Sequence, residues 1–399
     1  MDYIELVKIY QELEKTTKRL EKTEIVSNFI KKVPTEHLSD IIHLLEGRIF
    51  PEWDERNIGF SSRLMIKAIS QATGISMKDV ESRWSKMGDL GDVAEELTSK
   101  KKQSTLFSSK LTVKKVFENI RKLAELEGKG TVDKKISLVA ELLTSASPKE
   151  SRFIARTILE DLRVGIAAGI LRDAIAKAFN QEIKKVELAF VLTVDYGEVA
   201  KLSKNNELKA VSLKPGKPIK MMLAITASNV DEGFEYLGNP MQCEFKLDGF
   251  RIQIHKYKNE IRLFTRRMEN VTKQFPDLVK IAKNHIKGDS FILDAEAVSY
   301  DKKTKKYLPF QNISQRIKRK YNIEEMAEKF PIELNVFDCI FFNNKSLMNE
   351  QLIERRKLIE SIIKPETGKI RTTEKLITSD FKEAKRFFKE SLEQGTEGI

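Results

Sequence analysis

A lysine lies between two acids in the middle of the chain. Strand-like alternation places Glu244 and Lys246 on one face, and Arg251 follows just beyond Asp248-Gly249. A lysine amine becomes a nucleophile only when it loses its proton, which its ordinary pKa of about 10.4 opposes unless positive charge or burial is nearby. The stretch also has the pattern of a plain β-hairpin, since Asp-Gly between alternating residues is a strong hairpin signal. Taken alone, it favours the hairpin.

Further charged residues follow on predicted strands. One strand ends with Arg266 and Arg267 after Thr265, and strand alternation allows only one of the two arginines to point inward. Another strand places Asp294 and Glu296 on one face, opposite a row of apolar residues. Asp294 is therefore a candidate either for a pocket or for a strand-end cap.

Two more segments complete the series. Phe337 lies opposite Val336 on a mostly apolar strand, where core packing would be its default assignment. The last residues of the sequence include Glu397-Gly398. The lysine stretch thus has four segments with charged or aromatic residues after it.

At residues 213–399 these segments resemble the covalent nucleotidyltransferase superfamily of DNA ligases, RNA ligases and mRNA-capping enzymes. The segments that carry the resemblance stand in the family's order: Glu244 to Arg251, Thr265-Arg266, Asp294-x-Glu296, Val336-Phe337-Asp338 and Glu397-Gly398. Residues 1–205 resemble the helical DNA-binding domain of archaeal and eukaryotic ATP-dependent DNA ligases, with similar strings at 162–165 and 216–220. Together they point to an archaeal-type ATP-dependent DNA ligase.

The resemblance implies that Lys246 is the nucleophile, which takes AMP from ATP and releases pyrophosphate. It assigns a nucleotide pocket to Glu244, Arg251, Arg266, Glu296 and Phe337. Glu244 would accept a hydrogen bond from the adenine amine, and Phe337 would stack on the ring. The arginines suit phosphate oxygens, and Glu296 and Glu397 suit Mg²⁺, which prefers oxygen ligands. The implied cofactors are ATP, as AMP donor, and Mg²⁺.

In the reaction that the resemblance implies, AMP then passes to the 5′-phosphate of a nick in double-stranded DNA. The 3′-hydroxyl finally attacks that phosphate and expels AMP, as replication, repair and recombination require. The sequence departs from the family in two ways. Met221 replaces a proline, and the sequence stops at Ile399, before a lysine-bearing motif and an OB-fold domain. We therefore expect a piece of a longer protein that ligates poorly or not at all.

Three alternatives are open. A GTP-dependent capping-type nucleotidyltransferase shares the lysine motif but needs no long helical region before it. An NAD-dependent ligase typically carries a four-cysteine zinc site, and this chain has two cysteines. A non-catalytic DNA-binding scaffold would not need Lys246, Glu296 and Phe337 together.

The elements that must position these residues fall into two classes. Residues 1–205 predict an all-α domain of about a dozen helices, because apolar residues recur at helical spacing. The helical patterns cover 4–20, 36–45, 61–72, 113–127, 134–143, 150–162 and 171–178. Residues 206–220 form a linker and the start of the catalytic domain, since they lack periodicity and contain Lys214-Pro215-Gly216-Lys217-Pro218.

Residues 221–399 predict an α/β or α+β adenylation domain that is incomplete at its C-terminal end. The predicted strands are 242–247, 251–257, 260–265, 290–300 and 332–342. The predicted helices are 276–287, 350–363 and 380–392.

Two stretches of the helical half are candidates for contact with partners, one with a sliding clamp and one with DNA. Gln103, Leu106 and Phe107 resemble an abbreviated sliding-clamp-binding peptide, in which a glutamine precedes an apolar-aromatic pair. The alternative is a solvated loop with one anchoring Phe. Arg163 and Gly165 interrupt a helical pattern and are candidates for contact with DNA phosphates, because the next helix begins with free N–H groups. The residues alone favour a turn capped by glycine.

Composition is consistent with a nucleic-acid partner. The formal net charge is +12, which favours a polyanion, although many basic proteins bind none. Two cysteines and four histidines give no disulfide framework and no histidine-built metal site, and they fit a reducing, intracellular location. There is no apolar run long enough for a membrane span and no signal peptide. A cytoplasmic monomer associated with the nucleoid is the default expectation.

Overall fold

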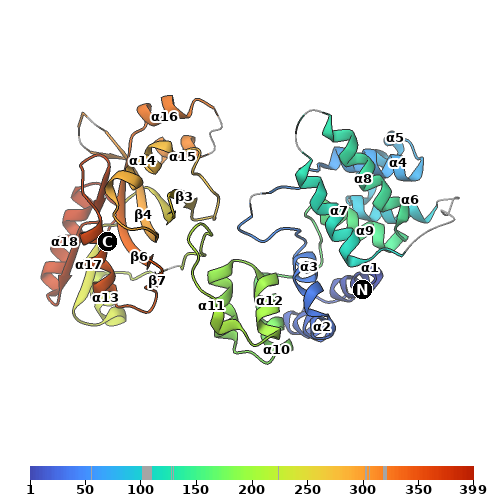
Figure 1. Ribbon diagram of the computed structural model, residues 1–399, viewed down its shortest axis with the longest axis horizontal. Helices are drawn as coiled ribbons and strands as arrows, with labels where there is room; N and C mark the ends of the chain where they lie inside the picture. Colours follow the sequence, from blue (N-terminus) through green and yellow to red (C-terminus); the bar gives the residue numbers. More distant parts are fainter. Residues whose placement is uncertain are drawn as a thin grey trace. The chain divides into compact units, whose positions relative to one another are not determined.

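The computed structural model divides into two compact units, Met1–Val211 and Ser212–Ile399 (Figure 1). The division falls inside the segment 206–220. The residues described are 1–399 without Glu55, 101–109, Glu127, Lys129, Leu223, Lys302, Lys305 and 318–320, and without the side chain of Asn312.

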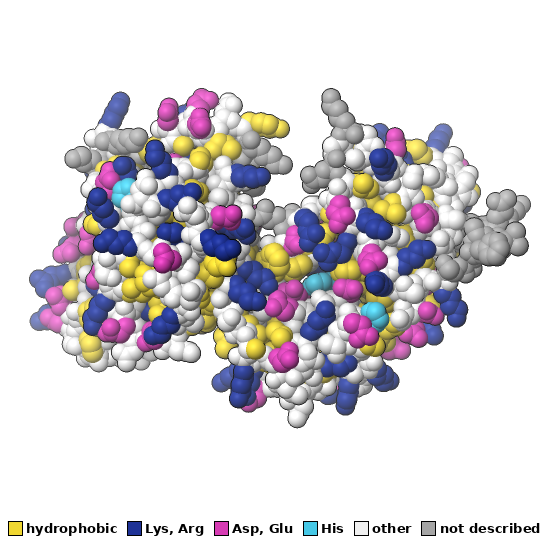
Figure 2. All heavy atoms as spheres, viewed as in Figure 1, with side chains coloured by type: hydrophobic (Ala, Val, Ile, Leu, Met, Phe, Trp, Pro, Cys, Tyr) yellow, Lys and Arg dark blue, Asp and Glu magenta, His cyan; other side chains and the backbone are white. Residues whose placement is uncertain are grey.

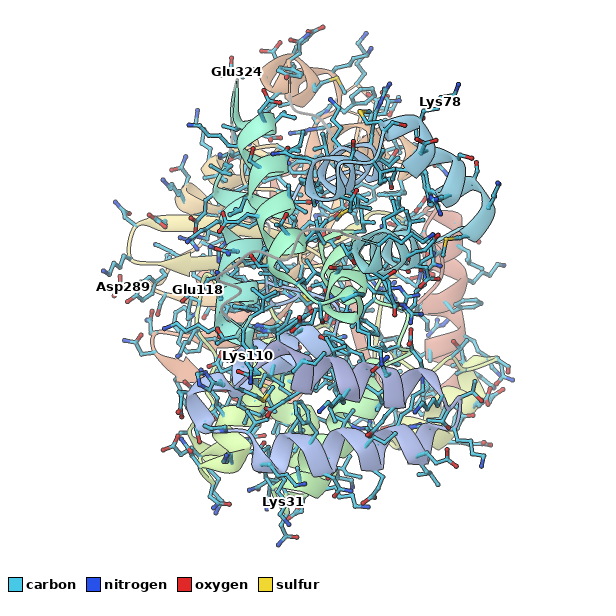
Figure 3. The ribbon with its side chains drawn as sticks, turned by 90° about the vertical axis from the view of Figure 1, so that its right-hand side faces the viewer. Lys31, Lys78, Lys110, Glu118, Asp289 and Glu324 are labelled. Atoms are coloured by element: carbon cyan, nitrogen blue, oxygen red, sulfur yellow. The ribbon has the colours of Figure 1, made fainter. Side chains whose placement is uncertain are left out.

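The first unit is helical, as the sequence predicts. Its described residues form twelve α-helices: α1 Tyr3–Glu14, α2 Arg19–Lys32, α3 Thr35–Leu45, α4 Ser62–Thr73, α5 Met77–Met87, α6 Leu90–Ser99, α7 Val113–Glu125, α8 Thr131–Ser145, α9 Pro148–Ile158, α10 Ala168–Ala178, α11 Ile183–Thr193 and α12 Tyr196–Lys204. A 3₁₀ turn, Leu208–Ala210, follows. Side chains such as Lys31 and Lys78 point outward from this unit (Figure 3).

Side-chain caps explain several of the helix starts. Ser147 and Glu150 form a capping box at α9, in which each side chain accepts from the other residue's backbone N–H. The Asp89 carboxylate accepts from two N–H groups at the start of α6, and Asp195 accepts from Glu198 N–H at α12. These caps satisfy donors that a helix cannot pair within itself.

Two predictions in this half are wrong in detail. The apolar spacing over 4–20 suggested one run, but α1 ends at Glu14, and Leu20 in α2 is 82% exposed. The pattern over 150–162 is also too long, because α9 ends at Ile158 and Glu160 takes a positive φ of 56°.

The second unit is built on a seven-stranded sheet in its described residues. The strands are β2 Phe250–Tyr257, β3 Glu260–Thr265, β4 Phe291–Tyr300, β5 Tyr307–Leu308, β6 Ile332–Phe342, β7 Lys345–Ser346 and β8 Ile370–Thr372. Their order is β3-β2-β4-β6-β7, with β5 beside β4 and β8 parallel to β6. The prediction of a helical half followed by an α/β half is therefore confirmed.

Helices cover the apolar face of this sheet. Those that do so are α14 Pro276–His285, α15 Gln311–Ile317 and α17 Leu352–Ile362. The unit also contains α16 Ile323–Lys329, which packs on α15, and α13 Val230–Leu237 and α18 Phe381–Glu393, which pack on each other. Phe291, Leu293 and Ala295 of β4 are fully buried in a core shared with α14 and α17. Asp294 and Glu296 alternate with them and so face the other side, as the period of two requires.

A second, smaller sheet pairs β1 Met241–Glu244 with β9 Lys375–Thr378 in antiparallel register. It packs with α13 and α18 around Phe234, Cys243 and Ala384. The lysine stretch therefore leaves one sheet and enters another.

The hairpin interpretation of Asp248-Gly249 is wrong for this reason. β1 pairs with β9, whereas β2 pairs with β3 and β4. Gly249 is needed for space, since a Cβ at this position would lie 2.5 Å from the Ala297 carbonyl oxygen. The glycine lets the chain cross closely over β4 as it enters β2.

Candidate active site

A cavity of about 1,320 Å³ lies within the second unit. Seven predicted site residues line it: Glu244, Lys246, Arg251, Arg266, Glu296, Phe337 and Glu397. They come from β1, β2, β4, β6, the end of β3 and the last residues of the chain. The structure thus brings together residues that the sequence spreads over more than 150 positions.

Lys246 lies just after β1 and is held by the end of the chain. Its N–H donates to the Gly398 carbonyl at 2.8 Å, and the Glu397 N–H donates to the Lys246 carbonyl at 2.8 Å. The side chains of Lys246 and Glu397 form an ion pair, with 61% and 46% of their surfaces exposed. The amine therefore reaches into the open cavity, while its backbone is fixed from both sides.

Arg251 is held by Asp294. Its Nε donates to Asp294 Oδ1 at 3.0 Å and its Nη2 to Oδ2 at 2.5 Å. The guanidinium carbon also lies 5.4 Å from the centre of the Phe337 ring. Asp294 does not line the cavity and lies in the middle of β4, so it is neither a pocket residue nor a strand-end cap.

Glu296 has an unusual acidity. Burial, together with the neighbouring negative charge of Asp294, raises the pKa of its carboxyl to about 8, although Arg251 and Lys246 oppose the shift. Burial also raises the pKa of Asp294, against the hydrogen bonds from Arg251. Near neutral pH the Glu296 carboxyl is therefore mostly protonated in this conformation.

Glu244 is half-buried at the end of β1. Its Oε1 accepts from Gln242 Nε2 at 2.8 Å and lies 3.3 Å from Arg356 Nη1. Burial raises the pKa of Glu244, while the Arg356 charge lowers it. No pattern in the sequence pointed to Arg356, because α17 was predicted only as a helix and its partner, Glu244, lies far away in the sequence.

Arg266 and Arg267 both line the cavity and are both exposed. The expectation that only one could point inward is wrong, because β3 ends at Thr265 and its alternation does not continue. Met268 takes a positive φ of 66° directly afterwards, and the chain turns back to place Asn270 beside Phe264.

In the first unit, Arg163 and Gly165 lie between α9 and α10. Arg163 is 46% exposed and forms ion pairs with Asp89 at 2.9 Å and Asp161 at 2.7 Å. Gly165 has a φ of 65°, and a Cβ there would lie 2.4 Å from Lys22 Nζ. Both residues thus have structural reasons for their type. Gln103, Leu106 and Phe107 lie outside the described residues.

Neither a metal cluster nor a membrane helix is found in the described part of the chain. It contains no group of three or more His, Cys, Asp or Glu side chains arranged to hold a metal ion. No described helix combines the length and the apolar character needed to cross a lipid bilayer. Lysine and arginine side chains are interspersed with acids on the face in Figure 2.

A lysine that projects into a cavity lined by arginines, carboxylates and an aromatic ring agrees with the covalent nucleotidyltransferase class, which the sequence motifs resemble. The family model described as "ATP dependent DNA ligase domain" matches residues 221–399, and that described as "DNA ligase N terminus" matches residues 2–176.

Known DNA ligases are similar to this chain over its full sequence. The DNA ligase of Nanoarchaeum equitans is 42% identical over 402 residues, which cover 100% of this chain and 71% of that protein. The DNA ligase of Thermococcus onnurineus is 41% identical with the same coverage, and that of Methanosphaera stadtmanae is 39% identical and covered to 72%. The chain therefore belongs to the ATP-dependent DNA ligase family. Neither a capping enzyme nor a scaffold is favoured by these matches.

Proposed function

We propose that the second unit transfers AMP from ATP to Lys246 and from there to the 5′-phosphate of a nick in duplex DNA. The observation that supports this most directly is the convergence of the seven predicted residues on one cavity, with an exposed lysine among them. In the first step an N–P bond forms at Lys246, the bond between the α-phosphorus and pyrophosphate breaks, and pyrophosphate leaves. The 3′-hydroxyl of the nick then displaces AMP from the activated phosphate.

The residues of the cavity have distinct roles in this proposal. Arg266 offers a guanidinium to phosphate oxygens, and Arg251, fixed by Asp294, adds a positive charge at a set position. The half-buried ring of Phe337 offers a face for adenine. Transfer of a phosphoryl-type group depends mostly on such positioning and charge neutralisation.

The Lys246–Glu397 ion pair has a consequence for the first step. In this pairing the lysine is an ammonium ion, and an amine without its proton is needed for attack. Glu397, and Glu296 once it has released its proton, are the oxygen donors that would hold Mg²⁺, which keeps several waters and needs only one or two carboxylates. When bound, Mg²⁺ would neutralise phosphate charge and compete with the lysine for the Glu397 carboxylate.

Intact-mass spectrometry tests the first transfer. The chain is incubated with Mg²⁺ and either ATP, GTP or NAD⁺, beside Lys246→Ala and, as a matched control, Lys345→Ala at an exposed lysine outside the cavity. We expect an AMP adduct from ATP that Lys345→Ala keeps and Lys246→Ala loses. An adduct that survives in Lys246→Ala, or a GMP adduct, would contradict the proposal.

We also propose that the first unit binds duplex DNA through phosphates, without reading sequence. The chain as a whole has a formal net charge of +12, and the first unit contributes +4 of it, from 36 Lys and Arg against 32 Asp and Glu, so the support lies in the basic character of the chain as a whole. Binding to nicked duplexes of unrelated sequence should be equal and should weaken steeply with salt in fluorescence anisotropy. Arg163→Ala should lower the slope of log affinity against log salt by about one at most, because two acids already share its charge. Affinity that does not depend on salt would count against this role.

The sliding-clamp contact through Gln103, Leu106 and Phe107 stays a prediction. Calorimetry of Phe107→Ala against a sliding clamp measures it, and unchanged affinity would exclude it. The cytoplasmic location and the monomeric state are likewise predictions, the latter testable by sedimentation.

A further inference from the structure

Arg356 is among the largest fully buried side chains of the described residues, with 1% of its side chain exposed. A guanidinium is rarely buried unless it is paired, because its charge loses the solvation of water. The position of this arginine in α17 places its charged end under the cavity floor, between β1, β6 and the segment before β9. Such a placement calls for a reason.

The contacts of Arg356 give that reason. Nη2 donates to the Thr373 carbonyl at 2.8 Å, and Nη1 lies 3.5 Å from the carbonyl oxygens of Val336 and Phe337. Nη1 also lies 3.3 Å from Glu244 Oε1. One side chain therefore contacts the backbone beneath Phe337 and the carboxylate of Glu244, two of the residues that line the cavity.

Glu244 is held at one oxygen only. Among the described residues, both polar contacts of its carboxylate, from Gln242 and Arg356, fall on Oε1. Oε2 is thereby left for a ligand in the cavity. A carboxylate can only accept hydrogen bonds, whereas a protonated carboxyl can also donate.

We propose that Arg356 is a positioning residue for base selection, which keeps Glu244 ionised and oriented so that it accepts from an exocyclic amine. The inference rests on the proposed function, in which adenine occupies this cavity. Adenine presents a 6-amino donor and guanine a 6-oxo acceptor. An ionised Glu244 attracts the first and repels the second, so the buried arginine would set the preference without touching the base.

The charges around Glu244 support the proposal that Arg356 keeps this carboxylate ionised. Burial raises the pKa of Glu244, Asp338 raises it further, and Arg356 and Lys375 oppose the rise. Glu360 pairs with both cations, with Lys375 at 2.5 Å and with Arg356 at 3.7 Å, and of the two Arg356 opposes the rise in the pKa of Glu244 more. Without Arg356, a half-buried Glu244 would tend to take up a proton and could then donate to guanine.

Equilibrium binding tests the proposal with three probes: ATP, GTP and purine riboside triphosphate, which lacks the 6-amino group. The wild-type chain should bind ATP about tenfold or more tightly than purine riboside triphosphate, as a hydrogen bond to a charged group predicts. In Arg356→Met the affinity for ATP should exceed that for purine riboside triphosphate by less than about threefold. The ratio of the ATP affinity to the GTP affinity should also decrease.

Arg355→Met is the matched control. Arg355 is the neighbouring residue of the same helix, is 16% exposed, and forms an ion pair with Asp338 at 2.7 Å, without a contact to Glu244. Its loss leaves the Asp338 charge unpaired, and Asp338 raises the pKa of Glu244. The ratio of the ATP affinity to the affinity for purine riboside triphosphate should therefore fall in Arg355→Met, but clearly less than in Arg356→Met. Equal narrowing in Arg355→Met and Arg356→Met would overturn the inference, because general loosening would then explain both.

Two further variants separate charge from packing. Arg356→Lys keeps the positive charge and should retain more of the ratio than Arg356→Gln, which keeps N–H donors but is neutral; equal ratios would overturn the proposal. These two variants also decide the matter if Arg356→Met does not fold. In a Glu244→Gln background, adding Arg356→Gln should change the ratio little, since its target is gone.

The outcomes also separate this inference from the function beneath it. If the wild-type chain itself does not distinguish the three nucleotides, the proposed adenine site fails. If it does distinguish them and the neutral Arg356 variants keep the full ratio, only the role of Arg356 fails.

Discussion

The titration of Glu296 should be visible in the stability of the second unit. The pKa of its carboxyl is raised from 4.5 to about 8 in the folded chain, mainly by burial. Below pH 4.5 both states hold the proton, and the contribution to stability is fully present. As pH rises, the unfolded chain releases this proton first, so the folded state loses stability until the pH passes about 8.

The size of the effect follows from the span between the two values. About 3.5 pH units, at about 1.36 kcal/mol for each, set a ceiling near 5 kcal/mol. Glu296 retains partial contact with solvent, and its charged neighbours can adjust. We therefore expect a loss of about 1–3 kcal/mol in the free energy of unfolding between about pH 5.5 and pH 8.5.

Glu296→Gln replaces the titrating carboxyl with a neutral amide of nearly the same shape. The free energy of unfolding of this variant should therefore not decrease between about pH 5.5 and pH 8.5. Urea unfolding at several pH values, followed by circular dichroism, compares it with the wild type and with Glu324→Gln, an exposed control whose side chain points outward (Figure 3). Both tryptophans, Trp53 and Trp84, lie in the first unit, so tryptophan fluorescence reports that unit separately.

The free energy of unfolding of Glu296→Gln, relative to that of the wild type, should increase as pH rises. The corresponding difference for Glu324→Gln should not change with pH. A difference that is constant across the pH range would refute the reasoning, because it would mean that Glu296 has similar acidity in both states.

Two further predictions concern the supports of the cavity. Gly249→Ala should cost about 1–3 kcal/mol in unfolding free energy, because its Cβ would lie 2.5 Å from the Ala297 carbonyl oxygen; an unchanged urea midpoint would contradict it. Arg316, 1% exposed, donates from Nη2 to Asp277 Oδ1 at 2.6 Å and anchors α15. Arg316→Met should cost about 3 kcal/mol, and Asp277→Asn more, since it leaves the buried charge alone; the reverse order in urea unfolding would count against this account.

The longer strands of the second unit were predictable because their periodicity is local, whereas β5, β7, β8 and β9, of two to four residues each, are too short to show a period and were not predicted. The bounds of β3 and β6 match the predicted 260–265 and 332–342, and β4 differs from its prediction by one residue. The apolar face of β4 and the opposite position of Glu296 also follow directly from a period of two.

What the sequence could not show depends on contacts between distant segments. An Asp-Gly pair signals a hairpin locally, and only the pairing of β1 with β9 reveals that Gly249 serves a close approach. Arg356 looks like any charge on a helix until Glu244 lies beside it. Leu20 fits the spacing of α1 but belongs to the next helix, where it faces solvent.

The bond between Lys246 and the last residues of the chain also has a consequence in time. The two N–H···O=C bonds join Lys246 to Glu397 and Gly398, about 150 residues later in synthesis. At about 5–20 residues per second, a ribosome takes about 8–30 s to make that stretch. During this interval the nascent lysine segment lacks its backbone partners and the Glu397 carboxylate. The Lys246 amine therefore meets its Glu397 partner only at the close of this part of translation, after the residues of β2, β3, β4 and β6 have been made.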